Sequence, residues 1–243
     1  AGILALVSMI YLLGRGILRE LGGDPAQVGE VARRVAAGDL ATQVQVRDGD
    51  RRSVMAAMAE MQVSIKAILD AQQEMARLHD EGRISYRIDV SRYPGAFGEL
   101  AQKVNELVAQ HIAVKMRVVE VVSQYARGDL SVDMDRLPGE KAKITEAIDG
   151  VKASLQGVNG EIGKLVAAAS LGDFGVRGDE QAYEHSFREM VAGLNRLMNA
   201  ADVGLSEVAQ VLQKVAEGDL TRRVEGDLQG KFAELKADTN KTV

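Results

Sequence analysis

The chain has 243 residues, of which 46% are hydrophobic, 27% charged and only 4% aromatic, and its formal net charge is −5. It contains no Cys or Trp and only three Pro. So few aromatic residues and helix breakers argue against a β-sandwich or barrel and favour long helices. Without Cys there can be no disulfide scaffold and no Cys-ligated metal, and the acidic balance gives no electrostatic footprint for nucleic acid.

The chain starts with an uncharged apolar run, Ala1 to Leu13, which is followed by Arg15 and Arg19. As a helix this run covers about 20 Å, less than the ~30 Å hydrocarbon core of a bilayer. A signal peptide places its basic residues before the apolar run, whereas a membrane helix emerging into the cytoplasm places them after it. We therefore interpret residues 1–18 as the end of a transmembrane helix. No helix-ending signal precedes Val243, so the sequence reads as a fragment at both ends.

A short motif built around glycine recurs five times. The glycines are separated by steps of 44, 46, 44 and 46 residues, and Asp follows each of them except the second, where Arg83 stands. Glycine at a helix end, followed by about twelve irregular residues, is typical of a C-cap and a connector. The predicted helix-ending glycines are Gly38, Gly82, Gly128, Gly172 and Gly218.

Each predicted connector carries apolar residues that could anchor it to the helices. In four copies the two anchors lie four residues apart: Leu40 and Val44, Ile84 and Ile88, Leu130 and Met134, Leu220 and Val224. The other copy has Phe174 but Gly178 in the second place, which predicts a looser connector. A connector of this length can run back along one helix, so that the next helix points the same way.

The segments between connectors have an apolar heptad pattern. From Phe97 to Tyr125 the apolar positions alternate in steps of three and four, with His111 as the one polar member. Segments 54–75, 144–165 and 187–215 keep the same period. Such a seam needs partner helices. We therefore predict an all-α fold in which two chains form five stacked, parallel four-helix bundles, making a coiled-coil rod.

These motifs resemble a known family. Leu21 to Pro25, leading into a short helix that ends at Gly38, resembles the start of a HAMP domain, with Pro25 at the first helical position. Residues 50–58 resemble the second HAMP helix of bacterial chemoreceptors, and residues 97–100 and 232–235 resemble their concatenated HAMP arrays. The expected domains are HAMP 1 (19–69), HAMP 2 (70–112, divergent), HAMP 3 (113–158), HAMP 4 (159–202, divergent) and HAMP 5 (203–243, truncated).

The resemblance implies a homodimeric methyl-accepting chemotaxis protein in the bacterial inner membrane, with residues from about 20 onward in the cytoplasm. Such receptors act on a chemotaxis histidine kinase and a coupling protein through a C-terminal region that residues 1–243 lack. It also implies that each bundle relays a signal by switching between two packings. The expected relay core is Pro25, Leu40, Val44, Met58, Ile84, Ile88, Leu100, His111, Leu130, Met134, Leu155, Phe174, Leu194, Leu220 and Val224.

Other chemistry has little support in the sequence. His79, His111 and His185 are too far apart for a local metal motif, and a polar residue at a core position such as His111 usually sets the register of a coiled coil. The alternative is a symmetric pair of His111 side chains binding heme or metal. The Gly-Asp motifs follow no phosphate-loop pattern, and the carboxylates are dispersed. We therefore expect no enzyme and no cofactor.

Two further questions stay open. Gly157, Gly160, Gly163 and Gly204 lie within predicted helices, either for close packing or as soft junctions between bundles. The relay could also belong to a sensor histidine kinase or a cyclase, or the chain could be a passive coiled-coil spacer. A passive spacer has no need of a polar loop every 44 to 46 residues.

Overall fold

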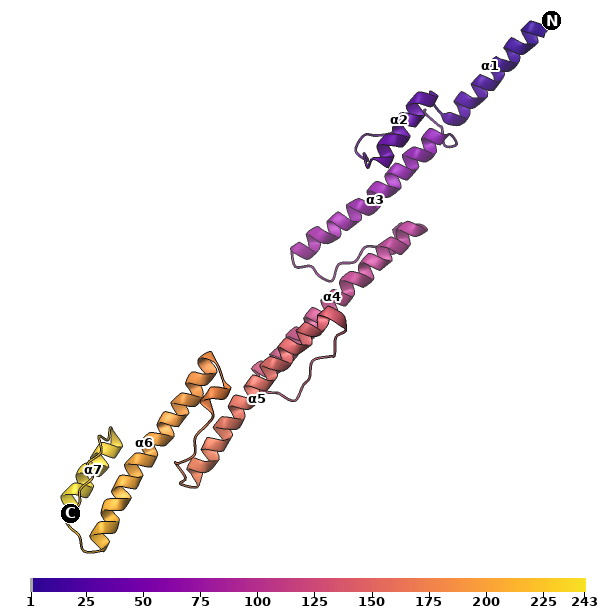
Figure 1. Ribbon diagram of the computed structural model, residues 1–243. Coiled ribbons are helices and arrows are strands. Elements are labelled where there is room, and N and C mark those ends of the chain that lie inside the picture. Colours follow the sequence, from indigo (N-terminus) through magenta and orange to yellow (C-terminus); the bar gives the residue numbers. More distant parts are fainter. Residues whose placement is uncertain (1) are drawn as a thin grey trace. The chain divides into compact units, whose positions relative to one another are not determined.

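The computed structural model describes residues 2–243, and this part of the chain contains helices and turns but no strand, which confirms the predicted all-α class. Figure 1 shows the elements. They are α1 (Gly2–Leu21), α2 (Pro25–Ala36), α3 (Val54–Asp80), α4 (Ala96–Ala126), α5 (Ala142–Ser170), α6 (His185–Ala216) and α7 (Lys231–Thr242), with short 3₁₀ turns η1 (Val90–Arg92), η2 (Gly139–Lys141) and η3 (Glu180–Ala182). The chain divides into two compact units, residues 1–115 and 116–243.

Helix α1 is apolar and exposed. Its large side chains from Ile3 to Ile17 are open to solvent, and it is the one described helix that is long and apolar enough to cross a membrane. Its last residue, Leu21, packs against the core of the first repeat.

The first repeat pairs α2 with the beginning of α3 (Figure 1). Helix α2 begins at Pro25, and the carboxylate of Asp24 caps it by accepting a hydrogen bond from the backbone N–H of Ala26 at 2.8 Å. Its core contains Val28 and Val31 of α2, together with Val44 from the connector and Met55 from α3. The connector, residues 37–53, therefore folds back between the two helices that it joins.

The second repeat has the same plan and completes the first unit. Ile68 and Met75, in the second half of α3, share a core with Ala101 of α4. Ile88, from connector 81–95, inserts between them. Helix α3 thus serves as the second helix of one repeat and the first helix of the next.

The second unit contains three more copies of this plan. In the third repeat, Val121 of α4 and Ile148 of α5 pack around Met134 of connector 127–141. In the fifth, Val208 and Val211 of α6 pack around Val224 of connector 217–230. The fourth repeat joins α5 to α6 through connector 171–184 and buries Val158, Leu165, Val191 and Met198.

Candidate functional site

The helix before every connector ends in the same backbone geometry. The five glycines have φ values of 84°, 87°, 87°, 81° and 89°, in the left-handed region that side chains disfavour. At the third, the N–H of Gly128 donates to the carbonyl of Tyr125 at 2.9 Å, and the N–H of Asp129 donates to that of Gln124 at 3.0 Å. This pair of bonds is a Schellman motif, and it recurs at Gly38, Gly82, Gly172 and Gly218.

The residue after the glycine begins the connector turn, a role that the sequence analysis did not assign. The Asp129 carboxylate accepts bonds from the backbone N–H of Ser131 at 2.9 Å and from its hydroxyl at 2.6 Å. Asp219 does the same with Thr221. Both hydrogen bonds from Ser131 lower the pKa of Asp129, and the bond from the hydroxyl has the larger effect. The spacing Asp-x-Ser/Thr is the sequence signal for this turn.

The two connector anchors differ in burial. The second anchor is buried in four copies, at Val44, Ile88, Met134 and Val224. The first anchor is half-buried at Leu40, Leu130 and Phe174, and exposed at Ile84 and Leu220. Four connectors therefore commit their second anchor to the core of their own chain, and all five leave the first anchor at least partly open.

Gly178 takes the place of the second anchor in the fourth repeat, and the expected looser connector is not what the contacts show. A Cβ at Gly178 would lie 2.8 Å from the Cγ1 atom of Val191, so the backbone itself occupies the space that a side chain fills elsewhere. Gly178 is buried, and its N–H and carbonyl are both hydrogen-bonded to Asn195. The connector backbone at Gly178 therefore packs directly against α6.

A side-chain amide from the following helix holds the connector backbone in four repeats. Asn105 accepts a bond from the Ile88 N–H and donates one to the Ile88 carbonyl, both at 2.9 Å. Asn195 bonds Gly178 in the same way, and Asn240 bonds Val224. In the first repeat, Gln62 bonds the Val44 N–H and the Thr42 carbonyl. We call Gln62, Asn105, Asn195 and Asn240 the clasp amides.

The clasp amides provide hydrogen-bond partners for connector backbone groups that are buried. Backbone N–H and carbonyl groups enclosed between helices cannot bond to water, and an amide supplies one donor and one acceptor together. Sequence reasoning missed these residues, although an Asn or Gln recurs 22 to 24 residues after four of the glycines.

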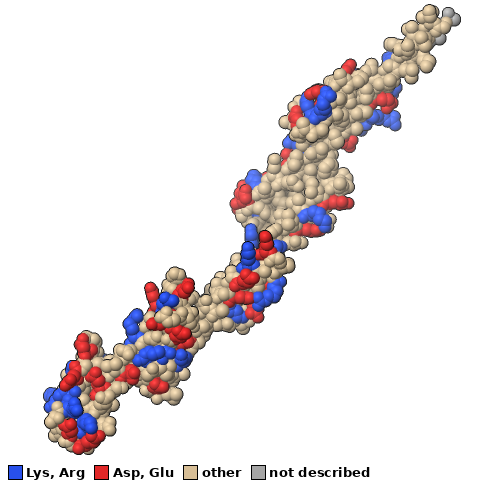
Figure 2. Space-filling model, in the orientation of Figure 1, with Lys and Arg blue, Asp and Glu red and all other residues tan. Residues whose placement is uncertain are grey.

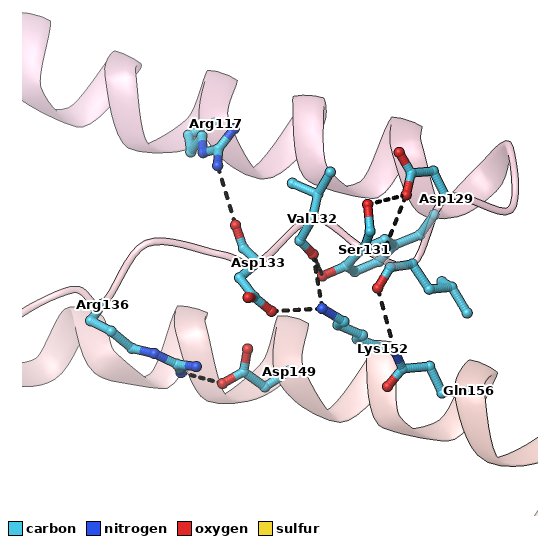
Figure 3. Close-up of polar contacts among 11 residues, drawn as sticks. Arg117, Asp129, Ser131, Val132, Asp133, Arg136, Asp149, Lys152 and Gln156 are labelled. Atoms are coloured by element: carbon cyan, nitrogen blue, oxygen red, sulfur yellow. Dashed lines mark hydrogen bonds and ion pairs between the residues drawn. The ribbon is translucent and has the colours of Figure 1, made fainter.

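In the third repeat a lysine takes the position of the clasp amide, and the Gln156 side chain, one turn further along α5, donates to the Leu130 carbonyl at 3.3 Å (Figure 3). Lys152 stands in the place of the clasp amide, where its Nζ donates to the Val132 carbonyl at 3.2 Å and pairs with Asp133 at 2.6 Å. From α4, Arg117 donates to the Asp133 carbonyl at 3.2 Å, and Arg136 of the connector pairs with Asp149 of α5. The hydrogen bond that the Lys152 Nζ donates to the Asp133 carboxylate lowers the pKa of Asp133 and raises the pKa of Lys152. Arg117 also pairs with Asp135 of the connector at 3.4 Å, so ion pairs link this connector to both helices.

A row of large apolar side chains stays exposed on the second helix of each of the first four repeats. On α4, Leu100 and Leu107 are 45% and 56% exposed, and seven residues separate them. The same spacing gives the other exposed pairs, and we call the whole set the exposed seam: Val54 and Met61, Leu100 and Leu107, Ile144 and Val151, Met190 and Leu197. His111 of α4 is also exposed, whereas Met58, Leu155 and Leu194 are half-buried. One chain alone therefore leaves half of a heptad core unfilled.

The glycines inside helices fall into two groups. A Cβ on Gly204 would lie 2.7 Å from the Phe232 ring, and one on Gly157 would lie 2.8 Å from the Tyr183 hydroxyl. Gly157 and Gly204 therefore allow Tyr183 and Phe232 to pack closely against their helices. Gly160 and Gly163 face open space.

The histidines do not come together. His79 bonds the Tyr86 carbonyl at 3.2 Å, and His185 begins α6 with φ of 46°. Gly95, Gly139 and Gly230, each with φ of 58°, stand at the corresponding place in three other repeats. Within residues 2–243, no three His, Asp or Glu side chains are arranged to hold a metal ion.

Comparison with known proteins shows which protein families these repeats are similar to. Residues 114–156 match the family model described as HAMP N-terminal domain 3, and residues 182–243 match the model of the HAMP domain. A curated relative is the methyl-accepting chemotaxis protein McpB of Pseudomonas aeruginosa, which is 26% identical over 79% of this chain and 48% of its own length. The chain thus spans about half of the length of this relative.

Proposed function

Because the chain is a tandem HAMP region of the kind found in methyl-accepting chemotaxis proteins, we propose that it relays a conformational signal within a membrane-anchored chemoreceptor. The signal starts at α1 and passes through the five repeats toward the output module of the receptor. The chain performs no catalysis in this role. It acts as a parallel homodimer, and through the rest of the receptor it controls a chemotaxis histidine kinase with its coupling protein.

The exposed seam is the observation that carries this proposal. Its side chains are large and apolar, and they recur at heptad spacing on four successive helices. A second copy with the same seam would bury them and complete a four-helix bundle around each connector. His111, which is exposed on α4, would then meet its symmetric counterpart.

Continuous helices supply the coupling between repeats. Each helix from α3 to α6 closes one repeat with its first half and opens the next with its second half. A rotation or tilt of one bundle is therefore passed to the next along the helix that the two repeats share. The expected relay core carries the change between two packings that bury similar apolar area.

The half-buried or exposed first anchors fit a switch better than a fixed core. Ile84 and Leu220 are exposed in one chain and can pack against a partner in one state and less in the other. A passive spacer, the rival proposal, would need neither the connectors nor their clasp amides. A relay in a sensor histidine kinase or cyclase would use the same repeats and differ in its output.

A charge placed in the seam tests the proposal. In the full receptor, Leu107→Glu puts a carboxylate into the proposed interface, and Gln110→Glu puts the same group on the exposed face of the same helix. We expect Leu107→Glu to abolish receptor-controlled autophosphorylation of the kinase and Gln110→Glu to leave it unchanged. Unchanged kinase control with Leu107→Glu would refute the paired relay.

A further inference from the structure

The arginines that precede the first lysine of the chain differ in whether they form ion pairs, and the difference depends on their position. All seven cationic residues before Lys66 are arginine. Arg33 and Arg34, in the last turn of α2, pair with Glu30 and Asp39 at 3.0 and 3.2 Å. Each of the other five is exposed, and no ion pair of theirs occurs among the described residues; they are Arg15, Arg19, Arg47, Arg51 and Arg52. We call these five the unpaired arginines.

The unpaired arginines gather where α1 meets the first repeat. Arg15 and Arg19 lie in the last two turns of α1. The end of α1 touches the start of α3, because a Cβ on Gly22 would lie 2.2 Å from the Ser53 Oγ. Arg51 and Arg52 immediately precede Ser53, and Arg47 belongs to the turn closed by the bond from the Asp50 N–H to its carbonyl at 3.0 Å. In Figure 2, charged side chains become dense where the first repeat begins.

Two of the four carboxylates at this junction accept hydrogen bonds from backbone N–H groups. Asp24 caps α2 through the Ala26 N–H, and Asp50 accepts bonds from the N–H groups of Arg52 and Ser53, each at 3.1 Å. Glu20 and Asp48 are the two carboxylates here that have no such backbone bond among the described residues. Residues 1–52 carry seven cationic and six acidic side chains, against 23 and 29 in residues 53–243. The rest of the chain therefore repels an anionic surface, and this end does not.

We propose that the unpaired arginines bind the phosphate groups of anionic lipids in the membrane that α1 enters. This inference rests on the membrane anchoring in the proposed function. From Arg15 to Leu21 the helix rises about 9 Å, and the headgroup layer is roughly 5–7 Å thick on each side of the hydrocarbon core. With Arg15 at the edge of the hydrocarbon, Arg51 and Arg52 lie just below the headgroups, within a Debye length and within reach of a long side chain. One guanidinium group can donate two parallel hydrogen bonds to a phosphate, whereas a lysine ammonium cannot, and this set contains arginines only.

Such binding holds the start of α3 at a fixed height relative to the membrane surface. Lipid phosphates that hold the start of α3 keep one helix of the first repeat at constant height while α1 moves. A displacement of α1 then becomes a change in packing between α2 and α3, instead of carrying the whole repeat with it.

The test uses the full chain reconstituted into vesicles of zwitterionic lipid, with or without one third anionic lipid. A fluorophore attached at an Ala26→Cys substitution, in the exposed first turn of α2, reports contact with a quencher on the lipid headgroups. Arg51→Gln with Arg52→Gln removes two unpaired arginines, and Arg33→Gln with Arg34→Gln is the matched control that removes two paired ones. Resistance to alkaline extraction measures membrane insertion separately.

We expect stronger quenching in anionic vesicles, and we expect 0.5 M salt to remove the increase because salt screens exposed charges. The Arg51/Arg52 variant should lose a large part of the increase, because only Arg15, Arg19 and Arg47 remain of the five, and the Arg33/Arg34 variant should match the wild type. Equal quenching in both lipids, or an equal fall in both variants, would overturn the inference and leave the proposed function standing if the chain resists extraction. A chain that is extracted would overturn both this inference and the membrane anchoring.

Discussion

The clasp amide of the second repeat offers a sharp test of how a connector is held. Asn105→Ala removes the two bonds that Asn105 makes to Ile88, each of 2.9 Å, and Ile88 is only 3% exposed. Each buried backbone group left without a partner costs about 1–3 kcal/mol. For the N–H and the carbonyl together we expect a loss of roughly 2–4 kcal/mol in the local opening free energy, since water can reach one of the two after some relaxation.

Amide hydrogen exchange measures this loss where it occurs, which matters because an array of repeats need not unfold as one unit. At 1.4 kcal/mol for each factor of ten, the Ile88 amide should exchange about 30-fold to several hundredfold faster. Gln110→Ala, on the exposed face of the same helix, is the control and should change nothing. Asn105→Asp keeps the acceptor for the N–H and should give an intermediate rate. If Asn105→Ala left exchange around Ile88 at the wild-type rate, the clasp would have no role in holding the connector.

Other substitutions address strain, packing and charge. His185→Gly should stabilise the fourth repeat by about 1 kcal/mol in local exchange, because His185 has φ of 46° where three other repeats have glycine; a loss of stability would show that its side chain contributes more than the strain costs. Gly204→Ala should destabilise the fifth repeat by about 1–3 kcal/mol by displacing Phe232, whereas Gly160→Ala in open space should stabilise its helix by about 1 kcal/mol; equal thermal shifts would contradict this. The pKa of Asp129 is lowered from its ordinary 3.8, so its contribution to the turn should be complete above about pH 5 and be lost as the pH falls below 3.8. A protection factor near Asp129, corrected for the intrinsic pH dependence of exchange, that does not change with acid would count against this prediction.

The sequence was informative wherever one residue type determines the backbone. Glycine tolerates a positive φ, so the five recurring glycines predicted where helices end, and a proline with no N–H to lose predicted the start of α2 at Pro25. The heptad spacing predicted long helices and marked the face that becomes the exposed seam. These features depend on local sequence alone.

Features that depend on two distant segments were harder to predict. The bonds from Asn195 to Gly178 join residues that lie 17 positions apart, and only the folded connector reveals them. For the same reason Gly178 suggested a loose connector, although its backbone packs directly on Val191. The left-handed conformation of His185 was also unforeseen, because histidine gives no signal of a positive φ.

Whether the repeats relay motion or only space a membrane anchor can be decided by cross-linking in the membrane. Single cysteines at Leu100 and Leu107, in a chain with no native Cys, are compared with one at Gln110 before and after Arg15→Leu, which lengthens the apolar run of α1 and draws it into the bilayer. We predict strong cross-linking between subunits at Leu100 and Leu107, little at Gln110, and a changed ratio of the two seam positions in the Arg15→Leu background. A ratio that stays constant would contradict a relay, and the absence of cross-linking at both seam positions would contradict the paired bundle itself.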